Sequence, residues 1–144
     1  MEQELCFLEE PGALEYPVAR LGDIRIYFVH YESAEEAAEK WNVRKKRIDW
    51  DNLFIMGCEK DGCTYETLRE FDSLPYERKV IFTKADYAEF SSAFYIEGFE
   101  ECQELGTITN FKKQFLKRRY LDDFDYISFL NGKDWKKKCK RGIC

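Results

Sequence analysis

The sequence contains little histidine and little proline: His30 is the only histidine, and there are three prolines in 144 residues. No apolar run approaches the roughly 20 residues that a membrane-spanning helix needs. The first residues, MEQELCFLEEPG, carry acidic side chains and neither a basic start nor a long apolar stretch, so they do not resemble a secretory signal. From these absences we expect a cytoplasmic protein.

The composition is that of a folded chain, because hydrophobic residues make up 44% of it and aromatic residues 17%. Disordered chains are poor in such residues. A chain of this length can bury one core of ordinary size and is short for two. We therefore expect one α/β domain over residues 1–132, followed by a basic C-terminal tail over residues 133–144.

The six cysteines do not form a recognisable metal or redox motif. Four residues separate Cys58 from Cys63, a spacing that matches neither a zinc knuckle nor a CxxC pair. With one histidine in the chain, mixed zinc ligand sets are few. We expect reduced, partly buried cysteines and no metal site, and the sequence implies no particular cofactor.

Charge is distributed unevenly along the chain, whose net charge is −5. Residues 1–110 hold 12 Lys/Arg against 24 Asp/Glu, whereas residues 111–144 hold 11 against 4. The basic tail could hold the protein at anionic lipid on the inner face of a membrane. The alternative is a solvated tail that offsets the acidic body. Nucleic acid is not an expected partner, because the acidic body would repel phosphates.

Apolar runs alternate with two helix signals in the first two thirds of the chain. Ser33 with Glu36 forms a capping box before a helix predicted over residues 34–47. Thr64 can cap a second helix with Tyr65, Leu68 and Phe71 on its inner face, and Leu74-Pro75 ends it. Runs rich in β-branched and aromatic residues predict strands at 24–29, 53–57, 79–83 and 93–96.

This alternation predicts an α/β fold of three layers, with a mainly parallel sheet and right-handed βαβ crossovers. We expect the strands at 24–29, 53–57 and 79–83 to be parallel neighbours, with Trp41 packing the first helix on them. After residue 105 the pattern indicates helices, with Phe111, Phe115, Phe124, Ile127 and Leu130 on apolar faces, so the C-terminal part is predicted to be helical.

Polar residues follow the predicted strands, and ligands of open parallel sheets bind beyond the carboxyl ends of the strands. His30-Tyr31, Asp61 and Thr83-Lys84 would then lie along one edge. His30 is a candidate general base, since histidine is the residue type whose ordinary pKa lies closest to neutral pH, and Asp61 is a second catalytic candidate. Each has a structural alternative: a packed histidine at a strand end, a turn aspartate, and a capping threonine.

Two further groups are weaker candidates for ligand binding. Arg44 and Arg47 share one side of the predicted helix with Trp41 and could grip phosphate or carboxylate, or could simply line the rim around a core tryptophan. Asp123 and Asp125 form a DxD pattern, which holds a divalent metal and diphosphate in sugar-nucleotide transferases. They could equally supply acids to the first turn of a helix.

Residues 16–56, YPVARLGDIRIYFVHYESAEEAAEKWNVRKKRIDWDNLFIM, resemble a bacterial family of unknown function, the DUF1919 family, often labelled exopolysaccharide or capsular polysaccharide biosynthesis proteins. Later segments, EFDSLPYERKVIFT and FDYISFLN, resemble it too. The matching pieces in the first stretch are Tyr16-Pro17-Val18, Leu21, Asp23-Ile24, Phe28, His30-Tyr31, Glu36-Ala37, Lys40-Trp41, Arg44, Arg47-Ile48 and Asn52-Leu53-Phe54.

The resemblance implies an α/β fold and a role in surface-glycan assembly, but no reaction. Family members usually begin with a further segment that contains a Ser-Asn-Asn-Cys-Trp type motif, which this sequence lacks. We therefore expect either a transferase that acts on a sugar or activated sugar, or a shortened, non-catalytic interaction protein. Exposed sheet edges would favour a homodimer. In the transferase, Tyr31, Arg44, Arg47, Thr83 and Lys84 would bind substrate.

Overall fold

The computed structural model describes residues 4–8, 15–113 and 117–135. The chain forms two compact units, Met1–Asp51 (unit 1) and Asn52–Cys144 (unit 2). One domain over residues 1–132 stays a prediction, since a domain can contain two compact units. Residues 136–144 of the predicted tail lie outside the described residues. In the described part of the chain, no helix is long and apolar enough to cross a membrane.

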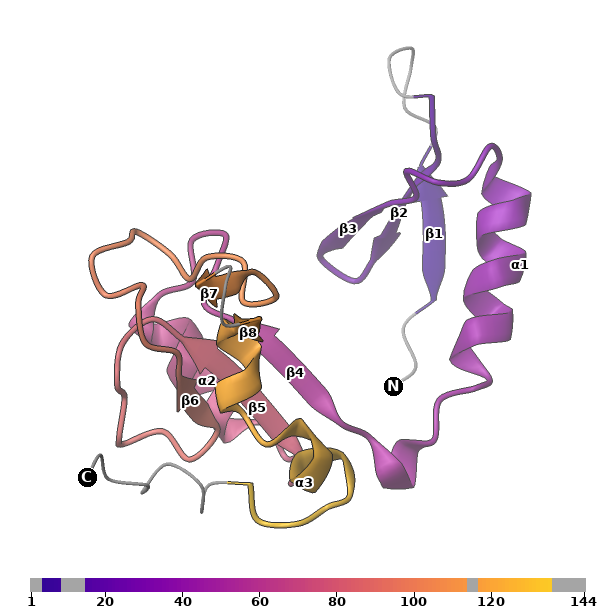
Figure 1. The fold of residues 1–144 in the computed structure, drawn as a ribbon. Helices are drawn as coiled ribbons and strands as arrows, with labels where there is room; N and C mark the ends of the chain where they lie inside the picture. Colours follow the sequence, from indigo (N-terminus) through magenta and orange to yellow (C-terminus); the bar gives the residue numbers. More distant parts are fainter. Residues whose placement is uncertain (1–3, 9–14, 114–116, 136–144) are drawn as a thin grey trace, which may run out of the picture. The chain divides into compact units, whose positions relative to one another are not determined.

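Unit 1 contains an antiparallel sheet of three strands, β1 (Leu5–Leu8), β2 (Val18–Leu21) and β3 (Ile24–Tyr27), in that order (Figure 1). A two-residue turn joins β2 to β3, because Leu21 pairs with Ile24. Gly22 in this turn has φ 63°, a left-handed conformation that glycine adopts at little cost. The short turn therefore fixes the register of β3 against β2.

The helix of unit 1, α1 (Ala34–Lys45), begins at the predicted Ser33, whose Oγ accepts the Glu36 N–H at 3.1 Å. Its inner face carries Ala37 and Trp41, which pack with Phe28 and Ala19. The Trp41 and Phe28 rings meet edge to face, 6.2 Å apart. Trp41 thus packs α1 as expected, but against the antiparallel sheet of unit 1 and not against the predicted parallel sheet. The chain then forms a short 3-10 turn, η1 (Trp50–Asn52).

Unit 2 contains a parallel sheet of β4 (Ile55–Cys58), β5 (Lys79–Thr83) and β6 (Ala93–Tyr95), in that order. The helix α2 (Tyr65–Ser73) connects β4 to β5. Thr64 caps this helix by accepting the Thr67 N–H at 3.2 Å. The prediction of a βαβ unit is confirmed here, and β5 has the bounds expected from the sequence.

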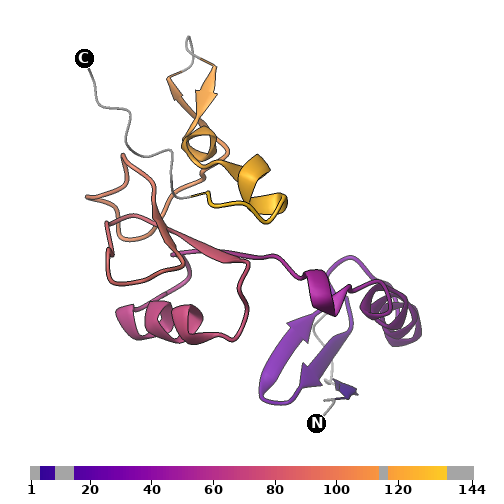
Figure 2. The same ribbon diagram turned by 90° about the horizontal axis from the view of Figure 1, so that it is seen from below.

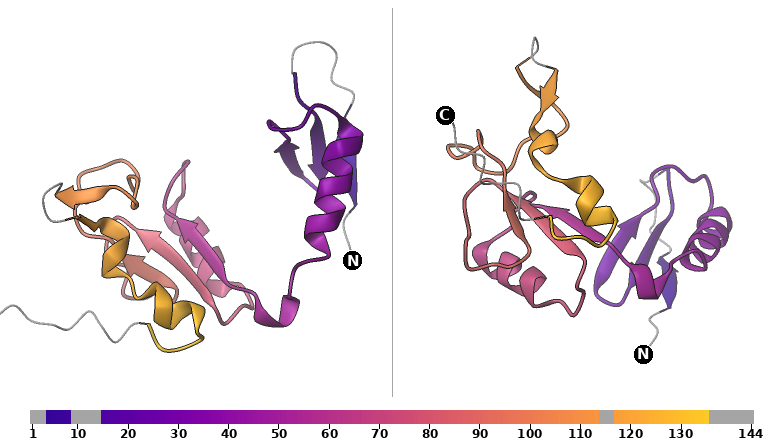
Figure 3. Two further views of the ribbon diagram at one scale, coloured as in Figure 1. Left: turned by 45° about the vertical axis from the view of Figure 1, so that its right-hand side comes forward. Right: turned by 60° about the horizontal axis from the view of Figure 1, so that its bottom comes forward.

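Each face of the parallel sheet is covered by a different segment, as Figures 2 and 3 show. Ile81 of β5 packs with Leu68 of α2 and with Phe90. The alternate residues of the same strand, Val80 and Phe82, belong to a second cluster on the other face. That cluster also contains Ile96, Phe99, Leu105, Phe124 and Phe129. Strand β5 therefore joins both halves of the core of unit 2.

The prediction that the strand at 24–29 neighbours the strands at 53–57 and 79–83 is wrong. Strand β3 pairs with β2, and the turn at Gly22 brings these two strands together. The run IRIYFV suggested a buried parallel strand, yet Ile24 is 61% exposed and Tyr27 49% exposed. Because the strands form separate sheets, the predicted three-layer arrangement around one sheet is not confirmed.

The predicted helical C-terminal part is wrong for residues 111–113 and 118–119, whereas Phe115 lies outside the described residues. Strands β7 (Phe111–Lys113) and β8 (Arg118–Arg119) pair there as an antiparallel hairpin. Exposure along β7 alternates, with Lys112 less exposed than its two neighbours, which is the two-residue period of a strand. Helical structure follows only in η3 (Tyr120–Asp123) and α3 (Tyr126–Leu130).

Phe124 gives the clearest test of this core. Its ring is 2% exposed and contacts Phe82, Phe94, Phe129 and Trp135. We expect Phe124→Ala to lower the free energy of unfolding by about 3–5 kcal/mol, because it leaves a cavity between β5 and α3. Urea denaturation measures this loss. The control Ile127→Ala, at a side chain 63% exposed, should change it by about 0.5 kcal/mol or less. Equal effects would contradict the packing.

Candidate functional site

The carboxyl edge of the parallel sheet is closed over β4 and β5 by the loop that follows β6. The Leu105 N–H donates to the Glu59 carbonyl at 2.9 Å, and the Asp61 N–H donates to the Glu104 carboxylate at 3.0 Å. The Lys84 ammonium donates to the Cys102 carbonyl at 2.8 Å. These bonds tie residues 102–105 to the ends of both strands.

Glu59, directly after β4, is a buried carboxylate at this edge, 5% exposed. Its Oε2 accepts the Lys84 N–H at 2.8 Å and its Oε1 accepts the Tyr87 hydroxyl at 3.3 Å. Burial and the Glu59 charge raise the pKa of Tyr87. Burial and the same charge raise the pKa of the Cys63 thiol. Glu59 was not selected from the sequence, although a charged residue at the end of an apolar strand was a signal.

The predicted site residues of unit 2 lie at this edge and take part in its hydrogen bonds. Asp61 has φ 53°, the turn conformation that its alternative role implies. Thr83 is fully buried, and its Oγ1 donates to the Ala85 carbonyl at 2.8 Å. Lys84 joins two loops through its backbone N–H and its ammonium group. The edge thus brings Asp61, Thr83 and Lys84 to neighbouring strand ends, as predicted.

The predicted site residues of unit 1 are not on this edge, because β3 belongs to the antiparallel sheet. His30 is exposed, in a turn closed by the Tyr31 N–H and the Phe28 carbonyl at 3.0 Å. Its imidazole makes no hydrogen bond with any described residue. The Arg44 guanidinium lies 5.8 Å from the centroid of the Tyr31 ring, whereas Arg47 is exposed at the end of α1.

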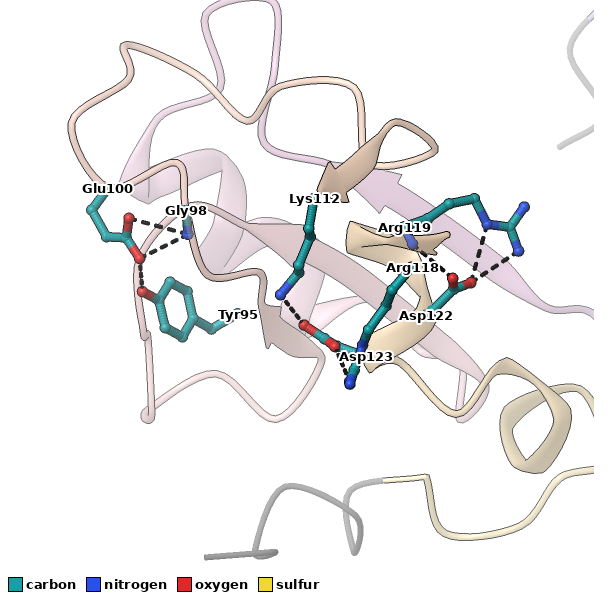
Figure 4. A network of polar contacts seen from close by, with 8 residues as sticks. All are labelled: Tyr95, Gly98, Glu100, Lys112, Arg118, Arg119, Asp122 and Asp123. Atoms are coloured by element: carbon teal, nitrogen blue, oxygen red, sulfur yellow. Dashed lines mark hydrogen bonds and ion pairs between the residues drawn. The ribbon is translucent and has the colours of Figure 1, made fainter. Parts of the chain in front are cut away.

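A hollow of about 430 Å³ lies at the carboxyl end of β6, where the edge is open. Two tyrosine rings and three charged side chains line it. They are Tyr95, Glu97, Glu100, Lys112 and Tyr120, together with Gly98. Figure 4 shows that Tyr95 stands at the end of β6 and Glu100 in the loop after it, whereas Lys112 comes from β7. The hollow therefore combines the parallel sheet with the hairpin.

Glu100 is the best-anchored carboxylate of this hollow. It accepts the Gly98 N–H through both oxygens, at 3.0 and 3.1 Å, and also the Tyr95 hydroxyl. Chiefly the Tyr95 hydrogen bond lowers the pKa of Glu100 to about 2, and the same bond raises the pKa of Tyr95 to about 12. Glu97, by contrast, is exposed and makes no hydrogen bond or ion pair within the described ranges.

Gly98 and Tyr120 meet on the floor of the hollow. Gly98 has φ 104°, and a Cβ there would stand 3.1 Å from the Tyr120 ring. Glycine is therefore required both by the backbone and by the close approach of the ring. The Phe99 ring also packs on Tyr120, with 4.5 Å between the ring centroids. Contacts with Gly98 and Phe99 thus hold the Tyr120 ring at the hollow.

The DxD aspartates have structural partners. Asp123 pairs with Lys112 and, at 2.5 Å, with Arg118, while the neighbouring Asp122 pairs with Arg119 at 2.9 Å (Figure 4). Asp125 caps α3 by accepting the Ser128 N–H at 3.1 Å, as the alternative reading of the motif expects. No three His, Cys, Asp or Glu side chains are grouped to hold a metal ion in the portion of the chain that the structure describes.

The hydrogen bond between Tyr95 and Glu100 predicts a coupled titration. Because the folded pKa of Glu100 lies below its ordinary 4.5, the bond stabilises the folded chain above that pH and is lost as pH falls through about 2. In Tyr95→Phe we expect the Glu100 pKa to rise towards 4.5, with the Gly98 N–H limiting the rise. Carboxyl carbon NMR against pH measures it. An unchanged Glu100 titration would show that the bond is absent in solution.

Comparison with known proteins identifies a relative and a family whose descriptions state no activity. A protein of Haemophilus influenzae described as "Uncharacterized protein" is 43% identical over 131 residues, which are 91% of this chain and 62% of that protein. The chain therefore spans less than two thirds of the length of this relative. No solved structure matches the chain. The family described as "Domain of unknown function (DUF1919)" matches residues 1–131, and the chain belongs to this family.

Proposed function

We propose that this protein binds a sugar unit in the hollow beside β6 and serves bacterial surface-polysaccharide biosynthesis. The observation that supports this proposal is the lining of the hollow, in which the rings of Tyr95 and Tyr120 accompany the charged groups of Glu97 and Lys112. Pockets that bind small polar molecules combine apolar walls with a few convergent polar groups.

A sugar ring presents two kinds of surface, and the hollow offers a partner for each. The carbon–hydrogen face of a pyranose is apolar and can lie on a tyrosine ring, whose body is apolar and whose edge is polar. Its hydroxyl groups donate to carboxylates and accept from ammonium groups. The Glu97 carboxylate makes no hydrogen bond with any described residue, so it can accept one from a sugar hydroxyl. The Lys112 ammonium would donate both to the sugar and to Asp123.

The position of the hollow supports the same proposal. In open parallel sheets, ligands bind beyond the carboxyl ends of the strands, and β6 ends at Tyr95. The ends of β4 and β5 are occupied by Glu59 and by the bonds to residues 102–105. A ligand at this edge would therefore contact the end of β6 first.

The proposal includes a transferase as its catalytic form. Transfer to a sugar hydroxyl needs a base that removes the hydroxyl proton. His30 is a candidate base chosen from the sequence, independently of the hollow, and its imidazole is exposed in unit 1. Asp61 would be the second candidate. The alternative is a non-catalytic protein that only binds a glycan, and the two forms differ in turnover and not in binding.

Sugar binding at the hollow can be measured by NMR titration with glucose, N-acetylglucosamine and glucuronic acid. We expect at least one of the three to shift the ring signals of Tyr95 and Tyr120. Glu97→Gln should weaken that binding about tenfold, since a hydrogen bond to a charged group is worth about 1.5–3 kcal/mol.

The matched control is Glu101→Gln, which removes the same charge from an exposed residue outside the hollow. It should leave the affinity within about twofold. If none of the three sugars shifts the tyrosine signals, or if both variants weaken binding equally, the hollow is not the sugar site.

The role of His30 is tested by His30→Gln, which keeps hydrogen bonding but cannot act as a base. Because the side chain is exposed, we expect the free energy of unfolding to change by about 0.5 kcal/mol or less. Turnover of an activated sugar, either in hydrolysis or in transfer to an added glycan, should fall by about 100-fold or more. Full turnover in the variant would remove His30 from the mechanism.

A further inference from the structure

The C-terminal end of α1 carries four consecutive cations, Arg44, Lys45, Lys46 and Arg47, next to exposed apolar side chains. We call residues 43–50 the basic end of α1. Its backbone keeps helix-like hydrogen bonds beyond the last residue of the helix. The Arg47 N–H donates to the Arg44 carbonyl at 3.0 Å and the Ile48 N–H to the Lys45 carbonyl at 3.2 Å. The side chains therefore project from an ordered turn.

Three large apolar side chains of this segment are exposed. Val43 and Ile48 are each 39% exposed and Trp50 is 62% exposed. Tryptophan is usually well buried, and Trp41 in the same unit packs into the core. Large apolar groups gathered on a surface commonly mark an interaction site.

The helix dipole accounts for only part of this arrangement. Cations are favoured at the C-terminal end of a helix and acids at its first turn, and Glu35 and Glu36 occupy the first turn of α1. The dipole thus explains Arg44 and Lys45. It gives no reason for an exposed Trp50, nor for Lys46 and Arg47 beyond the last helical residue.

We propose that the basic end of α1 docks on an anionic lipid surface. Cations next to such a surface are attracted by its negative potential, and tryptophan favours the boundary between headgroups and acyl chains, where its ring is apolar and its N–H stays hydrated. Val43 and Ile48 would enter the same boundary. The proposal uses other residues than the predicted tail at residues 133–144 and does not depend on sugar binding at β6.

The observations favour lipid over nucleic acid as the anionic partner. Lys46 and Arg47 could contact phosphates in either case. A nucleic-acid backbone offers no apolar region for Val43 and Ile48, whereas the acyl chains of a lipid surface do. The carboxylate of Asp49, which would also face the surface, accepts the Asp51 N–H at 3.2 Å, and the segment keeps an excess of cations.

The test is co-sedimentation of the full chain with two kinds of vesicle. One is phosphatidylcholine alone, and the other contains roughly one third phosphatidylglycerol. We expect binding only to the second, and weaker binding as salt increases. Lys46→Gln with Arg47→Gln should weaken it about tenfold or more. Lys60→Gln with Arg69→Gln removes the same charge from unit 2 and should change it by no more than about threefold.

The fluorescence of Trp50 reports whether its ring enters the lipid, which attraction between charges alone would not cause. Phosphatidylcholine brominated on its acyl chains, mixed into the anionic vesicles, should quench tryptophan emission of the bound protein, and Trp50→Phe should abolish this quenching. Replacing Lys136, Lys137 and Lys138 with Gln should leave the quenching in place.

Three outcomes would overturn the proposal. They are equal binding to both kinds of vesicle, quenching that survives Trp50→Phe, and binding to duplex DNA but to no vesicle that depends on Lys46 and Arg47. Unchanged thermal melting of the variants would show that the substitutions leave the fold intact.

Discussion

The backbone pairing of β5 with a parallel strand on each side is the constraint on which unit 2 depends. The strand is hydrogen-bonded to β4 and β6, and its residues Val80, Ile81, Phe82 and Thr83 are all buried. A parallel strand covered on both faces must be apolar throughout, which is why its side chains reach both clusters of the core. The ends of β4 and β6 are positioned by this strand, and so is every group at the carboxyl edge.

Glu59 shows how that edge is kept closed. A buried carboxylate is costly unless hydrogen bonds satisfy it, and here Lys84 and Tyr87 supply them from the loop after β5. Leu105 and Glu104 then hold the loop after β6 against the end of β4. Polar residues at strand ends suggest a ligand site when only the sequence is known. Here several of them are hydrogen-bonded to neighbouring loops, and the hollow lies instead at the end of β6.

The hairpin of β7 and β8 completes the hollow, since it supplies Lys112 and leads into Tyr120. In a strand, alternate residues face the same side, so Lys112 turns towards Asp123 while Phe111 is 53% exposed. If residues 111–113 formed a helix, Lys112 and Phe111 would not face opposite sides in this way. The ion pairs of Asp122 and Asp123 with three cations fix the hairpin to η3.

The sequence by itself determined the local elements whose signals lie within a few residues. These are the caps at Ser33 and Thr64, the end of α2 before Pro75 and the apolar strand at 79–83, because capping and burial depend on near neighbours. It also carried the family resemblance. The tertiary structure alone decided the partner of β3, since an apolar run looks the same in either kind of sheet, and the choice depended on the turn at Gly22. It likewise decided which polar residues gather at the hollow. Tyr95 and Glu97 are near neighbours in the sequence but lie well before Lys112 and Tyr120, and the pairing of β6 with β5 and of β7 with β8 brings the two groups together.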